Sequence, residues 1–475
     1  MGSLGTLPHT YNSLIVDRRV RWSYGIGSVA YGIKDHGFAY FLLFYYNQVL
    51  GLPGTYGGLA ILIALIFDSI TDPLVGLWSD NTRSRWGRRH PFMYAAACPV
   101  AIAYFFLWNP PQLVGFDLFI YLLVVSILVR FFVTLYEIPS SALVAELTDD
   151  YDERTQLLSY RYMLGWFGGL VMAVLNWGLL MVVWGEVSPI TYKIYGAIGA
   201  SIILIVILGS SWRLHRYIPL LHEPPIRSSY SLIGLLREMR ITLSNRNFAS
   251  LFFAGLFSAV GVGVATNFDT YIVTQFWGFA AEQWRWVILS LFLSALIPIF
   301  LAPRLTKRWD KKTTAIAIYF FQIIFGASPV ILRLLGVFPE NGSPYLLPII
   351  WVHTVINVTM IILFGVVQSS MLADVVEDSE VRTGRREEGL FFASRSFVQK
   401  ATTGIGAFIA GIALDWIKFP RGAAPGEISD EILWDLGFIY GPALMFFYFL
   451  ALVSITFYGI SRDEHNSRVV GLRKN

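Results

Sequence analysis

Twelve long apolar stretches, separated by polar loops, run through this chain from residue 22 to residue 460. A helix needs about 20 residues to cross the hydrocarbon core of a bilayer, and each stretch is long enough to do so. Hydrophobic residues make up 55% of the chain and charged residues only 14%, against about 25% charged in a typical soluble protein. We therefore predict an all-α membrane protein with twelve transmembrane helices. The predicted spans are 22–50, 55–78, 91–110, 116–148, 157–184, 191–212, 248–276, 283–303, 313–336, 346–376, 390–418 and 434–460.

The basic residues of the loops indicate how the chain is oriented. Of the 36 Lys and Arg residues, 26 fall on one side of the predicted spans, five on the other, and five inside spans. The side richer in lysine and arginine is normally the cytoplasmic one. We therefore expect both termini in the cytoplasm and the protein in the plasma membrane, which is the inner membrane of a bacterium. Residues 1–21 lack the apolar core of a cleavable signal peptide, so the first span is expected to direct insertion.

The longest polar stretch lies in the middle of the chain, at residues 213–247, and it divides the spans into six and six. We predict an N-terminal half at 1–212, a cytoplasmic linker at 213–247 and a C-terminal half at 248–475. The basic loop after the second span (DNTRSRWGRR) has a loose counterpart after the eighth, at 304–312 (RLTKRWDKK), which we also expect to be a loop. Two six-helix halves joined by a central linker describe the major facilitator fold.

Two acidic residues share one face of the second span. Asp68 and Asp72 are four residues apart, so on a helix their like charges face the same way. Each buried charge costs about 2.5–3.5 kcal/mol near the centre of a membrane helix. Either a bound cation such as Na⁺ lies between them, or one of them is protonated. The competing interpretation is that they cap a helix end or pair with arginines.

Ten ionisable residues lie in the interior of the predicted spans, five basic and five acidic. Left unpaired, they would cost on the order of 25–35 kcal/mol, which exceeds the stability of about 5–15 kcal/mol of a whole domain. We therefore expect them to pair or to line a watery cavity between helices. They are Lys34, Arg130, Arg161, Arg395, Lys400, Asp35, Asp68, Asp72, Glu137 and Asp269.

The fourth span carries the clearest polar pattern. Arg130, Thr134, Glu137 and Ser141 recur at helical spacing and form one polar stripe on an otherwise apolar helix. Such a stripe is too polar to face lipid, so it is expected to face a cavity.

Two other spans each contribute a pair of charges. Lys34 and Asp35 are adjacent in the first span, so we expect them to point in different directions. Arg395 and Lys400 precede or border a run of small residues in the eleventh span, which allows close approach of a neighbouring helix. For each charge alone, a structural ion pair and a substrate contact remain open; the set as a whole favours a central polar cavity.

Charged residues also gather where the tenth span ends. Asp374 ends that span, and Arg382, Arg385 and Arg386 follow in the predicted loop. They are expected either to form ion pairs that close a cytoplasmic gate or to be a solvated run of charges.

Several of these motifs together resemble the glycoside–pentoside–hexuronide:cation symporters, in both halves of the chain. The family's D-x-x-x-D-P cation motif resembles Asp68 and Asp72 before Pro73. Its arginine loop ending in W-G-[KR] resembles residues 83–88. From this loop, Arg83 is expected to be a gate residue. Its T-x-x-[DE]-I-P motif resembles Thr134 to Pro139.

The same resemblance implies roles for single residues. Thr134 is implied as a third cation ligand beside Asp68 and Asp72. Substrate contacts are implied for the Lys–Asp pair of the first span and for residues of the fourth, fifth and eleventh spans, and Asp374 is implied as a gate residue with Arg386 as its partner. The full expected substrate site is Lys34, Asp35, Arg130, Glu137, Ser141, Arg161, Arg395 and Lys400.

The chain departs from the family pattern at three positions. Glu137 is longer than the family's aspartate, Ser141 replaces a tryptophan that stacks on sugar, and Arg130 replaces a small residue. The resemblance implies cation-coupled symport of a sugar, glycoside or sugar acid by alternating access, with Na⁺ or H⁺ as the coupling cation. Because the family also contains lysophospholipid transporters, an amphipathic lipid-like or aromatic anion is the alternative substrate.

Other classes of protein fit the sequence poorly. It shows no nucleophile–base motif and no nucleotide-binding loop, so an enzyme is not expected, and the intramembrane charges argue against a receptor or scaffold. The single cysteine, Cys98, excludes an intrachain disulfide and a cysteine-built metal site. We expect no cofactor besides the coupling cation, no nucleic acid and no obligatory protein partner; the expected partners are the lipid bilayer, a small-molecule substrate and a monovalent cation.

The charges of the spans suggest an anionic substrate. Five basic and five acidic residues balance, so a bound monovalent cation leaves one positive charge that one negative charge on the substrate would cancel. Arg130 is expected to receive that anion, because a guanidinium binds a carboxylate through two parallel hydrogen bonds. The competing interpretation is that Arg130 pairs with Asp68 or Asp72, and so weakens or replaces the metal site and leaves coupling to protons or none.

Overall fold

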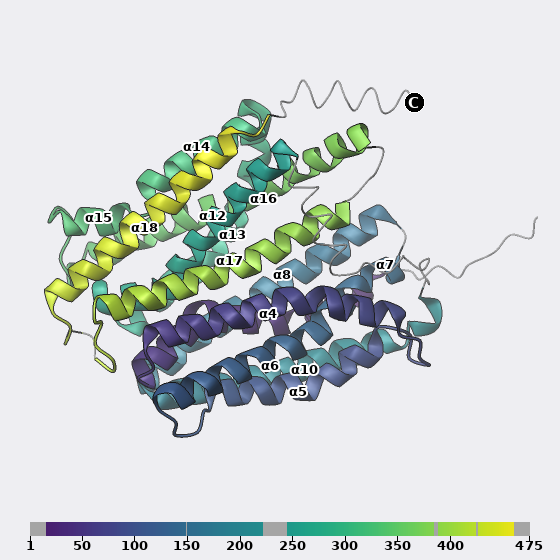
Figure 1. Ribbon diagram of the computed structural model, residues 1–475, viewed down its shortest axis with the longest axis horizontal. Coiled ribbons are helices and arrows are strands. Elements are labelled where there is room, and N and C mark those ends of the chain that lie inside the picture. Colours follow the sequence, from purple (N-terminus) through teal and green to yellow (C-terminus); the bar gives the residue numbers. More distant parts are fainter. Residues whose placement is uncertain (1–15, 149, 222–244, 384–387, 424–425, 460–475) are drawn as a thin grey trace, which may run out of the picture.

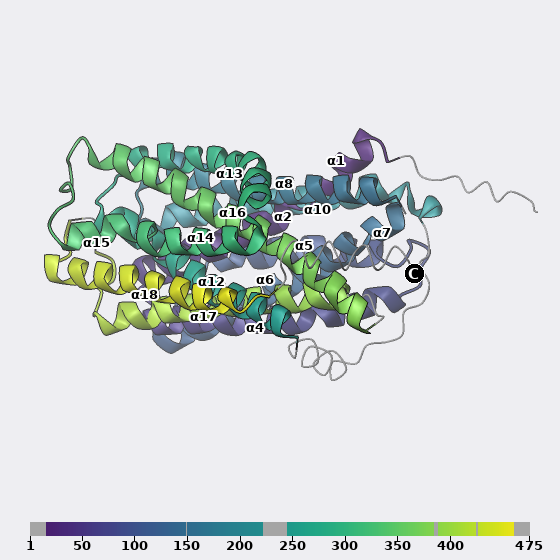
Figure 2. The same cartoon turned by 90° about the horizontal axis from the view of Figure 1, so that it is seen from above.

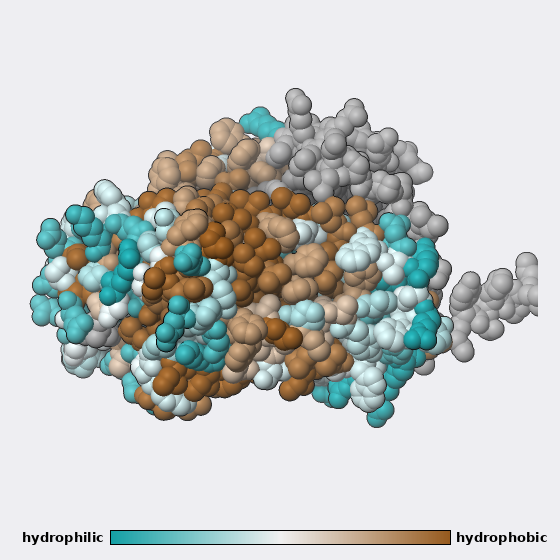
Figure 3. Space-filling model, turned by 60° about the horizontal axis from the view of Figure 1, so that its bottom comes forward, coloured by the Kyte–Doolittle hydropathy of each residue, from teal (hydrophilic) through white to brown (hydrophobic). Residues whose placement is uncertain are grey.

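The computed structural model describes residues 16–148, 150–221, 245–383, 388–423 and 426–459, and every regular element among them is helical. Within these ranges, ten helices are long and apolar enough to cross a membrane. The other two predicted spans are an interrupted first segment and α17 (Glu388–Trp416), of which Thr402–Trp416 is a shorter apolar piece. Hydrophobic residues cover the middle of the face in Figure 3 and hydrophilic ones gather at its two ends, as a membrane-spanning bundle requires.

The N-terminal half contains the elements up to residue 220. Asp17 caps its first helix by accepting a hydrogen bond of 2.9 Å from the backbone N–H of Val20, and Asp150 caps α8 in the same way. The elements are α1 (Arg18–Ile26), α2 (Val29–His36), η1 (Gly37–Phe41), α3 (Leu42–Phe44), η2 (Tyr45–Val49), α4 (Gly54–Asn81), α5 (His90–Trp108), α6 (Gly115–Ala142), α7 (Val144–Leu147), α8 (Tyr151–Leu175), η3 (Asn176–Leu180), α9 (Met181–Trp184), α10 (Pro189–His215) and η4 (Ile218–Leu220).

The C-terminal half begins at Asn245, which caps α12 with its side chain. Together with α17, its elements are α12 (Arg246–Tyr271), η5 (Ile272–Phe276), α13 (Ala281–Trp309), α14 (Lys311–Phe325), α15 (Ser328–Leu334), α16 (Leu346–Thr383) and α18 (Asp430–Thr456). Most of the predicted linker, residues 222–244, lies outside the described part of the chain.

The first predicted span is not one regular α-helix. It changes direction between α1 and α2, where Ser28 donates its hydroxyl to the carbonyl of Gly25 at 2.6 Å, and it contains two π-helical turns, η1 and η2. Glycines let α2 approach α8 closely: a Cβ placed on Gly32 would lie 1.8 Å from the carbonyl oxygen of Gly165. This close contact fixes the segment that carries Lys34 and Asp35.

Two predicted ends were wrong, because helices continue beyond the apolar residues. The expected loop 304–312 is mostly helix: α13 runs to Trp309, Asp310 makes the turn with φ of 69°, and α14 begins at Lys311. In the same way α16 reaches Thr383 instead of ending near residue 376. Neither extension contains a glycine before its end or a proline after residue 303, so the backbone has no reason to stop at the membrane boundary.

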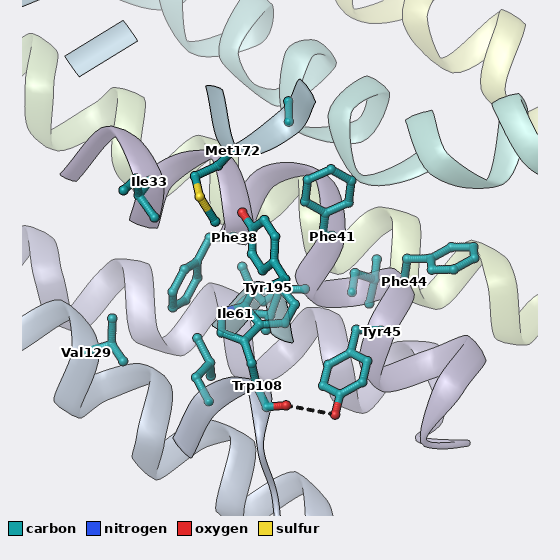
Figure 4. Packing of buried hydrophobic residues seen from close by; sticks show 14 of the residues in the cluster. Ile33, Phe38, Phe41, Phe44, Tyr45, Ile61, Trp108, Val129, Met172 and Tyr195 are labelled. Atoms are coloured by element: carbon teal, nitrogen blue, oxygen red, sulfur yellow. Dashed lines mark hydrogen bonds between the residues drawn. The ribbon is translucent and has the colours of Figure 1, made fainter. Parts of the chain in front are cut away.

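Aromatic side chains fill much of the core of the N-terminal half (Figure 4). Tyr45 donates its hydroxyl to the carbonyl oxygen of Trp108 at 3.1 Å, and Tyr195 packs edge-on against the Trp108 ring. Such contacts hold η2, α5 and α10 together as one unit.

The two halves meet along α4 and α17, which lie side by side in Figures 1 and 2. Small residues permit this contact, since a Cβ on Gly58 would lie 2.5 Å from the carbonyl oxygen of Ala407. Here we call the end of the bundle at which the described chain begins and finishes the termini end, and the opposite one the far end.

At the far end, side chains and backbone bond across the two halves. The Asp415 carboxylate accepts the backbone N–H groups of Gly54 and Thr55, at 2.9 and 2.7 Å, and so caps α4 from the other half. Thr270 donates to the carbonyl of Tyr40 at 2.9 Å. The structure is thus closed at the far end.

Candidate functional site

A cavity of about 440 Å³ lies between the two halves, halfway along the bundle. Six membrane-spanning segments line it: α2 with η1, α4, α6 and α8 from the N-terminal half, and α12 and α17 from the C-terminal half. Four of the predicted substrate residues are on its wall. They are Asp35, Arg130, Glu137 and Lys400.

The predicted cation ligands converge beside this cavity. The Thr134 hydroxyl lies 2.8 Å from Asp68 Oδ1 and 3.0 Å from Asp72 Oδ1, so the threonine bridges the two carboxylates. The site is not formed by oxygens alone, however. Arg130 donates from Nη1 to Asp68 Oδ2 at 3.0 Å, and the Lys400 ammonium lies 2.5 Å from Asp72 Oδ2 and 3.2 Å from Asp68 Oδ2.

These contacts match the competing interpretation of Arg130. Its guanidinium and the Lys400 ammonium supply the two positive charges that the paired carboxylates require, because a buried carboxylate must be matched by a positive group. Asp68 is 1% exposed and Arg130 only 3%, so the pair is inaccessible to bulk water. A metal ion bound between the two carboxylates would have to displace one or both basic groups.

Lys34 and Asp35 do not point apart as the sequence suggested. Lys34 Nζ lies 2.8 Å from Asp35 Oδ1 and 3.8 Å from Glu137 Oε2. The lysine side chain is long and flexible, so its ammonium can reach the carboxylate of the neighbouring residue although the two residues leave the helix in different directions. Lys34 is buried, whereas the Asp35 side chain is 58% exposed, so the acid is the member of the pair that a ligand in the cavity can reach.

Arg161 joins helices and contacts no carboxylate among the described residues. It donates to the hydroxyl of Ser140 and to the backbone carbonyl of Glu137, both at 3.0 Å. Its guanidinium also lies 5.1 Å from the ring centre of Tyr31. These contacts hold α8 against α6 and α2 next to Glu137. Arg161 can therefore position the Glu137 side chain on the cavity wall.

The remaining predicted substrate residues lie elsewhere or outside the description. Ser141 donates its hydroxyl to the carbonyl of Ile138 at 2.8 Å within its own helix and is not on the cavity wall. The side chain of Arg395 lies outside the described residues, as does the whole of Arg386, which was predicted as a gate residue.

Several residues of the cavity wall were missed by the sequence reasoning, because they are uncharged. Tyr31 and Tyr162 present aromatic rings, Phe38 lies under the Arg130 guanidinium at 4.4 Å, and Asn267 extends the wall into the C-terminal half. Tyr162 is 77% exposed. Tyr162 directly follows Arg161 in the sequence, and nothing in that position indicated that its ring would line the cavity. Ser141, which stands where the family has a sugar-stacking tryptophan, has no ring to offer.

Ion pairs also lie at the termini end. Asp374 accepts from Lys311 Nζ, at the start of α14, at 2.7 and 2.8 Å. Its expected partner, Arg386, lies outside the described residues. In the N-terminal half, Arg88 and Arg89 donate to Glu146 at 2.8 and 2.9 Å. These two sets of ion pairs occupy corresponding places in the two halves. In each half, the basic residues follow the second predicted span and the acidic residue lies near the end of the fourth.

Arg83, the third predicted gate residue, does not join them. It is exposed and donates to the backbone carbonyls of Asp80 and Thr82. In this structure, whose far end is closed, Arg83 therefore stabilises its own loop.

Comparison with protein families covers nearly the whole chain. Residues 23–462 match the model of the MFS/sugar transport protein family. An uncharacterized symporter of Synechocystis sp. is 27% identical, over 93% of this chain and 94% of its own length. The Escherichia coli inner membrane symporter YicJ is 26% identical over 85% and 83%, and the isoprimeverose transporter of Lactiplantibacillus pentosus is 22% identical over 94% and 89%.

Solved structures with the same fold are transporters. The nucleoside transporter NupG superposes with a TM-score of 0.61 at 14% identity, over 94% of this chain and all of that one. The xylose transporter XylE of E. coli, in a partially occluded inward-open conformation, superposes with a TM-score of 0.57 at 14% identity, over 90% and 97%. At these identities the likeness establishes the fold, and with it the predicted two halves of six helices.

Proposed function

Because the chain belongs to the MFS/sugar transport protein family, we propose that it carries a sugar, glycoside or sugar acid together with a monovalent cation, by alternating access. In this proposal the termini end faces the cytoplasm, since that end carries most of the basic loops. The observation that carries the proposal is the cavity of about 440 Å³ between the two halves, with acids, bases and tyrosines on one wall.

The wall of this cavity suits a polyhydroxylated ligand. Its volume falls within the roughly 300–1,000 Å³ of small-molecule sites. Asp35 and Glu137 supply acceptors for hydroxyl groups, and the rings of Tyr31 and Tyr162 supply flat surfaces for the apolar face of a pyranose. An acyl chain would gain nothing from these acids, so the lining favours a sugar over a lipid.

Arg130 and Lys400 favour a substrate with a negative charge. Both line the cavity, and both form ion pairs with Asp68 or Asp72. An incoming carboxylate would compete with Asp72 for Lys400, since Asp72 is the more exposed of the two aspartates, with 18% of its side chain accessible against 1% for Asp68. Release of Lys400 would leave Asp72 an unpaired charge in the membrane.

That release offers a way to couple the substrate to a proton. Asp72, once it loses Lys400, is stabilised by taking a proton from water onto its carboxylate, and the neutral acid can still accept from Thr134. The proton leaves again when the substrate departs and Lys400 returns. We therefore assign H⁺ as the coupling cation, with Asp68 held permanently by Arg130.

A substrate panel tests the proposal. Purified protein in proteoliposomes is offered a labelled glucuronide, the matching neutral glucoside and a lysophospholipid, each with an imposed pH gradient or Na⁺ gradient. The proposal expects glucuronide uptake driven by the pH gradient. Asp117→Asn, at an exposed acid in the first turn of α6 remote from the cavity, is the control variant. Preferred uptake of the lysophospholipid would reject the substrate class.

A further inference from the structure

A second cavity, of about 240 Å³, lies mainly within the C-terminal half, with two residues of the N-terminal half at its edge, and shares no residue with the predicted cation site or the wall of the first cavity. The N-terminal half contributes Tyr40 from η1 and Trp166 from α8 to its wall, and the C-terminal half contributes residues of α12, α16 and α18. Because both halves bound it, its access to water changes whenever the halves move against each other.

One acid faces this cavity without a partner. Asp269, on α12, lines the cavity, and within the described chain its carboxylate makes no ion pair and accepts no hydrogen bond. The other four acids of the span interiors are each matched by a basic group: Asp68 and Asp72 by Arg130 and Lys400, Asp35 and Glu137 by Lys34. Asp269 alone among these five has none in the part of the chain that is described.

No basic group among the described residues is in contact with the Asp269 carboxylate. The titratable residues on the cavity wall are Tyr40, Tyr440, Tyr448 and His353. His353 is already used by α14, because its Nε2 lies 2.8 Å from the carbonyl oxygen of Phe325 and its ring stacks on the Phe325 ring at 4.7 Å. Lys400 of α17 faces the first cavity and is engaged by Asp68 and Asp72. A carboxylate among neutral aromatic residues is stable in a membrane chiefly when it carries a proton.

Asp269 also lies beside the contact that closes the far end. The next residue, Thr270, donates to the Tyr40 carbonyl of the other half at 2.9 Å, and Tyr271 donates to Asn47 at 3.0 Å. When the far end opens, these hydrogen bonds must break, and water gains access to the adjacent carboxyl. The closed structure therefore encloses a group that the open one would expose to water.

We propose that Asp269 is a proton-binding site, distinct from the Asp68–Asp72 pair, that holds a proton while the far end is closed and can release it when the far end opens. The carboxyl takes its proton from water and returns it to water, so no other reactant is needed. This site adds to the proposed symport a proton-dependent element in the C-terminal half.

Carbodiimide labelling tests the proposal without any transported substrate. Dicyclohexylcarbodiimide reacts with protonated carboxyls in apolar surroundings, and mass spectrometry of the digested protein locates the adduct. Full-length protein in proteoliposomes is labelled over a series of pH values in choline chloride. We expect an adduct on Asp269 that is lost as the pH rises, is abolished in Asp269→Asn and persists in Asp269→Glu, while Asp117→Asn labels Asp269 like the wild type.

Two results would overturn the assignment. An unlabelled Asp269 at every pH, in wild-type protein that labels elsewhere, means that the carboxyl is not protonated. Loss of the adduct when NaCl replaces choline chloride at constant pH means that the site binds Na⁺ instead. The mapping in wild-type protein stands even if Asp269→Asn fails to fold, and a negative result leaves the substrate panel unaffected, so the two proposals can fail separately.

Discussion

At the scale of single residues, Arg130 is the residue on which the proposed coupling to protons depends most directly. Its guanidinium donates to Asp68 at 3.0 Å and packs on the Phe38 ring, so it occupies a place where a small residue would leave room for an ion. An arginine remains charged in any protein environment. The positive charge that lies nearest to Asp68 is therefore an arginine of the same chain and not a bound ion.

Removal of this arginine should restore a site for Na⁺. In Arg130→Gln the Asp68 carboxylate loses its fixed partner, and Asp68, Asp72 and Thr134 become free to offer oxygens to a hard ion. We expect uptake of the glucuronide to become dependent on Na⁺, with at least a tenfold loss of uptake in Na⁺-free medium relative to wild type, which corresponds to about 1.4 kcal/mol. Arg130→Lys, which keeps the charge, is the matched control; Na⁺ dependence in wild type and none gained in Arg130→Gln would contradict this role.

Glu137 is predicted to bind substrate and not the coupling cation. It lines the first cavity, and its nearest basic group is Lys34 at 3.8 Å, so a ligand can reach it. Glu137→Gln removes the charge at nearly constant volume and should raise the half-saturating substrate concentration about tenfold or more, as expected for a charged hydrogen bond of about 1.5–3 kcal/mol. The response of uptake to the pH gradient should be unchanged; a parallel loss of both would place Glu137 in the coupling site.

At the scale of elements, the pairing of α4 with α17 sets which end of the bundle is closed. Glycines bring the two helices together, and Asp415 caps α4 across the interface with two hydrogen bonds to backbone N–H groups. The sequence could predict α4 as a span, but not this cap. Asp415 lies some 360 residues from Gly54 along the chain, and only the folded arrangement brings a carboxylate to an uncapped helix start.

Loss of this cap should open the far end. A capping side chain contributes about 1 kcal/mol, so Asp415→Ala should raise the population that is open at the far end about fivefold. The measurement is the rate at which a membrane-impermeant maleimide labels Thr55→Cys in a Cys98→Ser background. Asp430→Ala, at the exposed start of α18, is the control for loss of a far-end acid. Equal labelling rates in the Asp415 variant and its parent would show that the cap does not hold the far end closed.

The ion pair between α14 and α16 is predicted to act at the other end. Lys311 and Asp374 form it in the C-terminal half, in the place of Arg88 and Arg89 with Glu146 in the N-terminal half. Lys311→Asp should lower uptake by placing two acids together, and Lys311→Asp with Asp374→Lys should recover much of it. Uptake in the double variant no better than in the single one would mean that the contact has no part in transport.

At the scale of the whole molecule, the sequence predicted the fold and the family well. The all-helical membrane fold and the resemblance to glycoside–cation symporters are confirmed by the helices, by the similar solved structures and by the family match. Apolar length and basic loops determine these features locally, which is why they can be read from one chain. The helix ends at Trp309 and Thr383 were missed, because polar residues continue a helix as readily as apolar ones.

Apart from Thr134, the candidate site was predictable only in its charged members. Asp68, Asp72 and Thr134 come together as expected, but their partners Arg130 and Lys400 belong to other helices, and the sequence left two interpretations of Arg130 open. The Ser141 hydroxyl bonds within its own helix, whereas Tyr162 lines the cavity, although both are polar residues on mostly apolar helices. Which side of a helix meets which neighbour depends on packing across the whole bundle.

The central claim is that substrate and proton move together through the cavity between the halves. Proteoliposomes that enclose a pH-sensitive dye, with equal pH and equal Na⁺ on both sides, receive a glucuronide from outside. The account predicts that the interior of wild-type vesicles acidifies as the glucuronide enters, that Asp72→Asn abolishes the acidification, and that the neutral glucoside produces less of it. Entry of the glucuronide without acidification, accelerated by an imposed Na⁺ gradient, would contradict the account.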